Sequence, residues 1–435
     1  MALIVDDALI FHGDPCEARP GTLATDGTAI VDTLPDAADH LAGNLVIPGL
    51  VIAHHHLYSA LARGMPGPAE GPTTFAEVLE KIWWRLDRAL DHELSELSAV
   101  VGSLEALRCG VTTIVDHHAS PSAVGGSLDA VANGILTAGA RGVVCYEATD
   151  RHGDEGFAEG VAENERMILR CAREADLGTR IRAMVGGHAP FTLRDEHLSA
   201  MARLAAAHGT WVHLHVAEAA DDQRDARERG HADVTARLEA AGILEGKSVL
   251  AHGVHLSEGE VARLGEGAWL THQPRSNMNN HVGYFEAARR HGRIALGTDG
   301  INSDLFDEAH AAFFRLRGHD RDAGAEEIWR WLAGGWRLAS EVFGLSAERG
   351  FGRLDPGCPA DFVVLDYDGP TPVHAGSLPW HLAFGMSARH VRHVVVGGEV
   401  VVRDGRSTRV DPVAQRERSF TEAERLWARM AALEA

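Results

Sequence analysis

The sequence predicts an α/β protein, a TIM-like (β/α)₈ barrel with a small β-sandwich domain built from both termini. Two observations support this prediction. Short β-branched runs alternate with longer amphipathic segments between residues 49 and 297, and both ends of the chain carry short strand-like segments separated by Gly, Pro and Asp. An open, doubly wound sheet would show the same alternation, so the strand count alone does not distinguish the two folds.

Eight runs are short and apolar enough to be the buried strands of the barrel. They are residues 49–53, 112–116, 141–147, 181–187, 211–216, 248–251, 269–271 and 294–297. Helical periodicity between them predicts helices at residues 75–90, 93–109, 194–208 and 233–241. We therefore assign residues 49–354 to the barrel.

The flanks of the chain are predicted to form a second, smaller unit. Strand-like segments at residues 2–5 and 28–31 resemble those at residues 361–366 and 394–402, where Gly397-Gly398 marks a hairpin turn. Residues 1–48 and 355–412 are therefore predicted to form the small β-rich domain, and residues 413–435 a C-terminal helix.

The composition narrows the classes of function. Among 435 residues, 62 Asp and Glu against 41 Lys and Arg give a formal net charge of −21, which disfavours binding to nucleic acid or to an anionic membrane. We find no signal peptide, no apolar stretch that would span a membrane, and no Cys-x-x-Cys pair among the five cysteines. We expect a cytoplasmic homo-oligomer (dimer or larger) that binds a small-molecule substrate and neither nucleic acid nor membrane.

The first predicted strand ends in three consecutive histidines, His54-His55-His56. Side chains alternate along a strand, so His54 and His56 point to the same side and could bind one metal ion together. An isolated histidine is more often structural than a metal ligand. Two histidines at this spacing, at the carboxyl end of a barrel strand, favour a metal site.

The fifth predicted strand ends in a similar pattern, His213-Leu214-His215, which Glu218 follows after a short turn. His213 and His215 share a face, and the spacing alone does not tell which of them would be a ligand. From its position, the Glu218 carboxylate could reach the site without binding the metal. An exposed helix start is the alternative for Glu218, because several acidic residues follow it.

Two more strands end in residues that can carry chemistry. His252 ends the sixth strand, and Asp299 follows the eighth strand between Gly297 and Gly300. A carboxylate at that position can bind a metal through one oxygen and accept a proton through the other. The four motifs all fall at the carboxyl ends of strands, which form the catalytic face of a barrel, so we expect them to meet in one site.

The combined pattern resembles the metal-dependent amidohydrolase superfamily, in its branch of cytosine deaminase and atrazine chlorohydrolase-like enzymes. The resemblance covers nearly the whole chain, from Pro48-Gly49 through the four motifs to Gly357-Cys358-Pro359-Ala360-Asp361. Further matches are Asp116-His117-His118, His188-Ala189-Pro190-Phe191-Thr192 and Pro274-Arg275-Ser276-Asn277. Within the branch, the pattern is most similar to the SsnA-type aminohydrolases.

The resemblance implies a role for each matching residue. The implied metal ligands are His54, His56, His215 and Asp299. The implied catalytic residues are Glu218 as proton carrier, Asp299, and His252 as a hydrogen-bond partner of the nucleophilic water or the substrate. The implied substrate-binding residues are His188, His117, His118 and Arg275. His213 is left with a structural role.

The scarcity of lysine predicts a single divalent metal ion per chain. Binuclear members of the superfamily bridge two ions with a carboxylated Lys at the end of strand four, whereas this chain has only Lys81 and Lys247, both away from residues 181–187. Three imidazole nitrogens and one carboxylate suit Zn²⁺, which we expect, and also Fe²⁺.

These roles predict a metal-dependent hydrolytic deaminase. Hydroxide formed at the metal would attack an sp² ring carbon of an aminated heterocycle (purine-, pterin- or triazine-like), and ammonia would leave. A ring-opening hydrolase of the cyclic amidase or imidazolone type could use the same residues. A non-catalytic, zinc-containing barrel that acts as a binding protein is a third hypothesis, although a structural zinc site needs no proton carrier such as Glu218.

Overall fold

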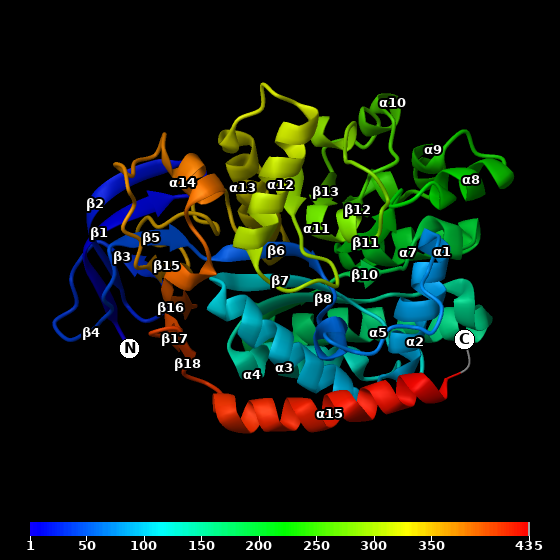
Figure 1. Cartoon of the computed structure of the whole chain (residues 1–435), viewed down its shortest axis with the longest axis horizontal. Helices are drawn as coiled ribbons and strands as arrows, with labels where there is room; N and C mark the ends of the chain where they lie inside the picture. Colours follow the sequence, from blue (N-terminus) through cyan, green and yellow to red (C-terminus); the bar gives the residue numbers. More distant parts are fainter. Residues whose placement is uncertain (434–435) are drawn as a thin grey trace.

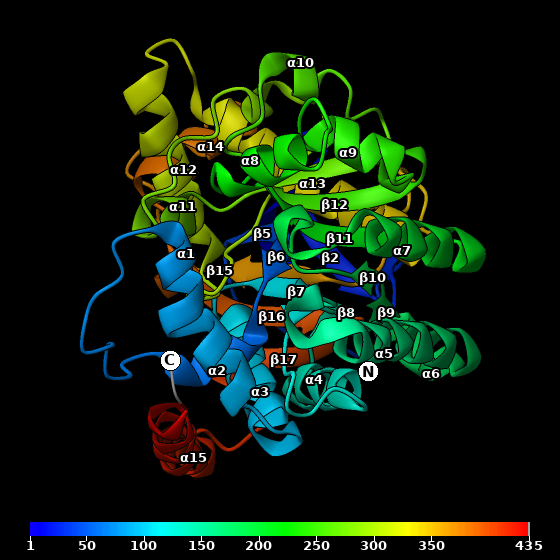
Figure 2. The same ribbon diagram turned by 90° about the vertical axis from the view of Figure 1, so that its right-hand side faces the viewer.

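The computed structural model describes residues 1–433 and has the predicted (β/α)₈ barrel at its centre (Figures 1 and 2). Its strands are β6 (Leu50–His55), β7 (Val111–His118), β8 (Arg141–Tyr146), β9 (Ile181–Ala183), β10 (Val185–Gly186), β11 (Trp211–Val216), β12 (Lys247–His252), β13 (Ala268–His272) and β14 (Ile294–Leu296). Parallel pairing follows chain order in two sheets, β6 to β9 and β10 to β14. Bridges between His55 and Asp299 and between Ala148 and Gly187 join the two sheets, which confirms the closed barrel.

The register of the strands brings their carboxyl ends to one face of the barrel. Val216 at the end of β11 pairs with His252 at the end of β12, and His55 at the end of β6 bridges to Asp299 after β14. The predicted fourth strand, residues 181–187, is divided at Met184, whose amide donates to the carbonyl of Val144 at 3.0 Å. The motifs found in the sequence therefore share one end of the barrel.

Helices surround the barrel (Figure 2). They are α3 (His92–Arg108), α4 (Ser127–Ala138), α5 (Gly153–Arg173), α6 (Ala175–Arg180), α7 (Asp195–His208), α8 (Asp221–Glu228), α9 (Val234–Ala240), α10 (Glu258–Val261), α11 (Pro274–Asn279), α12 (Leu305–His319) and α13 (Ala325–Phe343). Helix α13 lies so close to β14 that a Cβ at Gly334 would stand 1.7 Å from the carbonyl oxygen of Ile294. Within residues 1–433, no helix is both long and apolar enough to cross a membrane.

The segment predicted as one helix over residues 75–90 has three parts. Helix α1 (Phe75–Val78) continues into a π-helical segment (Leu79–Trp83) and then into α2 (Trp84–Ala89). A π-helical turn changes which side chains share a face, and such turns are frequent at functional sites. Here Trp83 and Trp84 both line the cavity at the carboxyl end of the barrel, Trp83 beside His56 and Trp84 beside His188.

The flanking strands form one nine-stranded sheet beside the barrel (Figure 1). They are β1 (Leu3–His12), β2 (Glu17–Thr25), β3 (Ile30–Val31), β4 (Asp39–His40), β5 (Leu45–Pro48), β15 (Phe362–Leu365), β16 (Val391–Val396), β17 (Glu399–Arg403) and β18 (Arg406–Ser407). Antiparallel pairing of β5 with β15 joins the two ends of the chain, and Gly397 and Gly398 form the turn between β16 and β17. The sheet encloses its own apolar cluster, to which Phe362 contributes.

Two further helices lie outside the barrel. Helix α14 (Leu378–Phe384) packs on α12 and α13, and α15 (Pro412–Ala432) runs along the outside of the molecule (Figure 1). Trp427 of α15 donates from Nε1 to the carbonyl of Leu61 at 2.9 Å, which ties the helix to the loop after β6. The predicted helix over residues 413–435 thus corresponds to α15, with residues 434–435 outside the described chain.

Candidate metal centre and active site

Five buried side chains converge at the carboxyl end of the barrel. His56 Nε2 lies 2.9 Å from Oδ1 of Asp299 and 3.1 Å from Nε2 of His215, and His54 Nε2 lies 3.5 Å from the same Asp299 oxygen. One ligand atom from each of His54, His215, His252 and Asp299 can be chosen so that all lie within 4.8 Å of one another. The structure therefore brings together all four residues implied as metal ligands.

Backbone carbonyls hold two of these imidazoles from behind. His56 Nδ1 donates to the carbonyl of His117 at 2.6 Å, and His215 Nδ1 donates to the carbonyl of His188 at 2.9 Å. A neutral ring that donates from Nδ1 keeps its Nε2 lone pair available, which is how a protein usually fixes a metal-binding histidine. Both Nε2 atoms consequently point into the cluster.

The third imidazole, His54, is supported by another histidine. His54 Nδ1 lies 2.9 Å from Nε2 of His213, and Nδ1 of His213 faces the thiol of Cys145 at 3.7 Å. His213 is thus placed behind His54 and not among the converging atoms. The Nε2 atoms of His54 and His252 are buried and have no hydrogen-bond partner in the described chain. Unsatisfied ring nitrogens beside a carboxylate are what a divalent metal site requires, so the donor set fits such an ion.

The backbone is strained at three positions around this cluster. Ala217, His252 and Asp299 have φ angles of 51°, 76° and 52°, in the left-handed region that residues other than glycine seldom adopt. Each position follows or ends a barrel strand, where the chain turns sharply and the side chain is directed toward the cavity. Strain of this kind is concentrated at functional sites in proteins.

Glu218 and His252 lie together on one side of the cluster. His252 Nε2 is 3.4 Å from Oε2 of Glu218, while Nδ1 of His252 donates to Asn277 at 2.9 Å and the amide of Asn280 donates to Oε1 of Glu218 at 3.2 Å. Burial and the neighbouring Asp299 carboxylate raise the pKa of Glu218 above its ordinary value, although His252 opposes them. A buried carboxyl group with a raised pKa is suited to carry a proton in a reaction.

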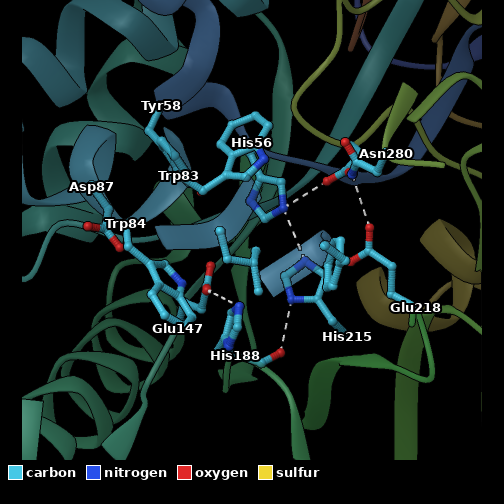
Figure 3. A pocket seen from close by; sticks show the side chains of 13 residues that line it. His56, Tyr58, Trp83, Trp84, Asp87, Glu147, His188, His215, Glu218 and Asn280 are labelled. Carbon is cyan, nitrogen blue, oxygen red and sulfur yellow. Dashed lines mark hydrogen bonds and ion pairs between the residues drawn. The ribbon is translucent and has the colours of Figure 1, made fainter. Parts of the chain in front are cut away.

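These residues open into one cavity, which Figure 3 shows from close by. Tyr58, Phe75, Trp83 and Trp84 give the cavity aromatic walls. Its polar lining includes Asp87, Glu147, His188, Glu218 and Asn280. Aromatic walls with polar groups around them suit a flat molecule that carries hydrogen-bonding edges.

The residues implied for substrate binding are placed differently from one another. His188 lines the cavity, whereas His117 and His118 are fully buried and are not part of its lining. Arg275 also lies outside the lining, and its guanidinium is bound to the buried Glu308 carboxylate at 2.6 Å. Of the four, the structure therefore brings only His188 to the cavity surface.

Two carboxylates in the lining, Glu147 and Asp87, were not singled out from the sequence. Glu147 directly follows β8, so its place at the carboxyl end of a strand was the available signal. Burial by itself raises the pKa of Glu147, but the imidazoles of His188 and His117 hold it below its ordinary value. Asp87 lies in α2, where nothing in the local pattern marks it as part of a site.

Curated proteins of similar sequence include deaminases of adenosine derivatives. The chain is 29% identical over 391 residues to the 5′-deoxyadenosine deaminase of Methanopyrus kandleri, covering 88% of this chain and 87% of that protein. It is 31% identical over 444 residues to the 5-methylthioadenosine/S-adenosylhomocysteine deaminase of Halobacterium salinarum, covering 98% and 97%.

Solved structures share the fold at lower identity. An adenosine deaminase from Xanthomonas campestris with bound zinc superposes with a TM-score of 0.83 at 21% identity, covering 98% of each chain. The atrazine chlorohydrolase of Arthrobacter aurescens, complexed with zinc, gives 0.77 at 21% identity, covering 98% of this chain and all of that one. The model of the amidohydrolase family matches residues 45–401, which include both the barrel and the converging ligands. The chain belongs to the amidohydrolase family.

Proposed function

We propose that this protein is a zinc-dependent hydrolytic deaminase of an aminated heterocycle (purine-, pterin- or triazine-like). One observation carries the proposal: Glu218, a buried carboxyl group with a raised pKa, lies beside His252 at the edge of the converging ligands without being one of them. These ligands are His54, His56, His215 and Asp299. A structural metal site has no use for a carboxyl group such as Glu218, whereas hydrolysis of a C–N bond needs one. The deaminase names of the curated relatives support the same reaction.

In this proposal, His54, His56, His215 and Asp299 hold one zinc ion. When bound, the ion supplies the Lewis acidity that lets water act as a nucleophile at neutral pH. With only Lys81 and Lys247 in the sequence, neither near the end of β10, the chain offers no carboxylated lysine to bridge a second ion. Elemental analysis of the purified protein is therefore expected to find about one zinc per chain, and two tightly held ions would contradict this part of the proposal.

Two carboxylates of the protein, Asp299 and Glu218, carry the protons of the reaction. Asp299 faces the histidines with Oδ1 and takes the proton of the attacking water through Oδ2, the oxygen that also accepts a hydrogen bond from the Ser276 hydroxyl. Glu218 delivers a proton to the ring nitrogen next to the reacting carbon. His252, oriented by its hydrogen bond to Asn277, is a hydrogen-bond partner of the attacking water or of the substrate. Asp299 then passes its proton to the amine, which leaves as ammonia, and the hydroxyl on the attacked carbon returns a proton to Glu218 as the product carbonyl forms.

An ammonia-release screen over purines, pterins and triazines tests the proposal, with mass spectrometry of each product. Deamination replaces NH₂ by OH and raises the mass by about one unit, whereas ring opening adds a whole water, about 18 units. Ammonia with an intact ring is the expected result. A product that has gained a water without ammonia would replace deamination by ring opening, and zinc-loaded protein that binds heterocycles without converting any would favour the binding-protein hypothesis.

A further inference from the structure

A second buried carboxylate, Glu147, lies across the cavity from Glu218, with the cluster between them (Figure 3). Glu147 is 4% exposed. Its Oε1 lies 3.4 Å from Nε2 of His188, and its Oε2 lies 3.4 Å from Nδ1 of His117. Both distances exceed the roughly 2.7–2.9 Å of a charge-assisted N–H···O bond. Within residues 1–433, Oε2 has no hydrogen-bond partner.

The neighbouring histidines do not satisfy this carboxylate. His117 donates from Nε2 to the carbonyl of His213 at 3.3 Å, and within residues 1–433 its Nδ1, 3.4 Å from Glu147, makes no hydrogen bond. A buried carboxylate is an acceptor of up to four hydrogen bonds, and leaving one unpaired is costly. Because Glu147 lines the cavity, a molecule that enters it can supply donors to this carboxylate.

A second metal ion is the alternative partner, because Glu147, His188 and His215 also lie within reach of one ion. Each neutral imidazole has one lone pair to give. His215 donates from Nδ1 to the His188 carbonyl, so its single lone pair is on Nε2, 3.1 Å from His56 and within the first cluster. This leaves Glu147 and His188 alone, which is fewer ligands than a transition-metal site uses.

The cavity lacks a cation for an anionic substrate. Among the described residues that line it, none is Lys or Arg. Arg151 stands behind the lining, where it donates to Oδ2 of Asp87 at 2.9 Å and stacks on Trp84 at 4.6 Å. Among the residues described, the other oxygen of Asp87, Oδ1, is buried without a hydrogen-bond partner, as Oε2 of Glu147 is. A substrate therefore meets two carboxylates with unused acceptor capacity, Glu147 and Asp87, and no Lys or Arg side chain in the described lining.

From this arrangement we propose that Glu147 recognises N–H donors on the edge of the heterocycle remote from the reacting amine. The preferred substrate class is then an uncharged or cationic heterocycle with ring N–H or amino groups on that edge, and without a carboxylate or phosphate substituent. Glu218 serves the reacting edge, Glu147 and Asp87 serve the opposite one, and Trp83 and Trp84 contact the ring. The inference rests on the deaminase proposal, for which it names the substrate class.

The first test compares matched substrates with the zinc-loaded wild-type protein. Each heterocycle that releases ammonia in the screen is assayed again with a methyl group on the remote ring nitrogen. Loss of the N–H leaves a buried acceptor unpaired, so kcat/KM is expected to fall about 10²-fold or more. Adenine, which has a ring N–H on that edge, is expected to react faster than 5′-methylthioadenosine, whose ring nitrogen bears the sugar, and S-adenosylhomocysteine is expected to be the poorest of the three because it also has a carboxylate.

The second test asks whether Glu147 causes the discrimination. Glu147→Gln keeps the size of the side chain and removes its charge, so kcat/KM is expected to fall about tenfold or more for the N–H substrate and to change little for the N-methylated one. Glu163→Gln is the matched control. Glu163 is also buried, but it binds the amides of Gly126 and Leu128 far from the lining, so its variant is expected to keep the wild-type preference.

A binding measurement separates failure of this inference from failure of the deaminase proposal. Thermal shifts of the zinc-loaded protein with N–H and N-methylated heterocycles require no turnover. If nothing releases ammonia but N–H ligands still stabilise the wild type more than Glu147→Gln, the deaminase proposal fails and the recognition by Glu147 stands. Equal preference for both ligand types, equal losses in both Glu147→Gln and Glu163→Gln, or a second zinc ion that Glu147→Gln removes would each overturn the inference.

Discussion

The carboxyl end of the barrel has more unpaired buried polar groups than the flanking sheet. At the barrel end, ring nitrogens of His54 and His252 and an oxygen of Glu147 are buried with no hydrogen-bond partner among the described residues. Where the barrel meets the sheet, Arg141 of β8 and Asp361 are joined by two hydrogen bonds of 2.8 and 3.0 Å, and the described strands of the sheet leave one buried ring nitrogen, Nε2 of His393, without a hydrogen-bond partner. Unpaired groups thus gather at the end of the barrel.

The backbone shows the same contrast. Apart from glycines, the left-handed residues described in the sheet region are Asp7 and Asp404, a residue type that tolerates this conformation, whereas the barrel end includes Ala217. Unsatisfied atoms and a strained alanine reduce stability, and they persist only where the rest of the fold compensates. The sheet and core therefore supply stability, while the barrel end is arranged for a metal and a substrate that supply the missing contacts.

The largest expected effect comes from removing a ligand at the barrel end. His54→Ala should leave much less than one zinc per chain and reduce turnover by more than about 10⁴-fold, because it removes the activated water as well as its position. Metal content and ammonia release measure both. His213→Ala is the graded comparison: it removes only the support behind His54, so metal affinity should fall by about 10–100-fold and activity should return with excess zinc. Equal losses of zinc and of turnover in His54→Ala and His213→Ala would contradict the distinction between a ligand and the residue that supports it.

The next effect should separate chemistry from metal binding. Glu218→Gln is expected to keep its zinc and its melting temperature while kcat falls by about 10²–10⁴-fold, because a proton carrier is lost and no ligand is changed. Steady-state kinetics and elemental analysis on the same preparation check this. Glu228→Gln, on the exposed part of α8, should behave as wild type. Full activity in Glu218→Gln would remove Glu218 from the mechanism.

A substitution in the flanking sheet should lower stability and leave turnover unchanged. Phe362 is fully buried in the sheet's own apolar cluster, and Phe362→Ala is expected to lower the free energy of unfolding by about 3–5 kcal/mol. The kcat of the protein that stays folded should not change. Phe420→Ala, at a side chain that is 66% exposed on α15, should shift stability by less than about 0.5 kcal/mol. Urea denaturation with matched kinetics tests both, and a loss of kcat in Phe362→Ala would break the proposed separation.

The converging ligands could be predicted from the sequence because each belongs to a local pattern. His54 and His56 alternate on one strand, and His215 and Asp299 follow apolar runs, so strand periodicity alone places them at one end of a barrel. The same alternation favoured a barrel but did not by itself exclude an open sheet. What the spacing left open, the choice between His213 and His215, depends on a contact with His54 across 159 residues.

The remaining parts of the site depend on contacts that no local pattern records. Glu147 is a single acidic residue after a strand. It reaches the site because the chain after β8 pairs with the chain after β10, through the bridge between Ala148 and Gly187. Arg275 belongs to a recognisable motif, but its bond to Glu308 is made 33 residues along the chain. The π-helical turn at Leu79–Trp83 is a departure of backbone geometry that helical periodicity does not reveal.

The smallest expected effect tests the strain at Ala217 itself. In a right-handed helix, Ala339→Gly in α13 should cost about 2 kcal/mol, from the lost methyl burial and the added backbone freedom of glycine. Ala217 is equally buried, but its φ of 51° costs an alanine about 1–2 kcal/mol that a glycine avoids. Ala217→Gly should therefore be close to neutral in stability, about 1–2 kcal/mol better than its control. It should also slow turnover, because Glu218, the next residue, is held less firmly. If both variants lose the same stability in urea denaturation, the barrel end stores no strain at this position.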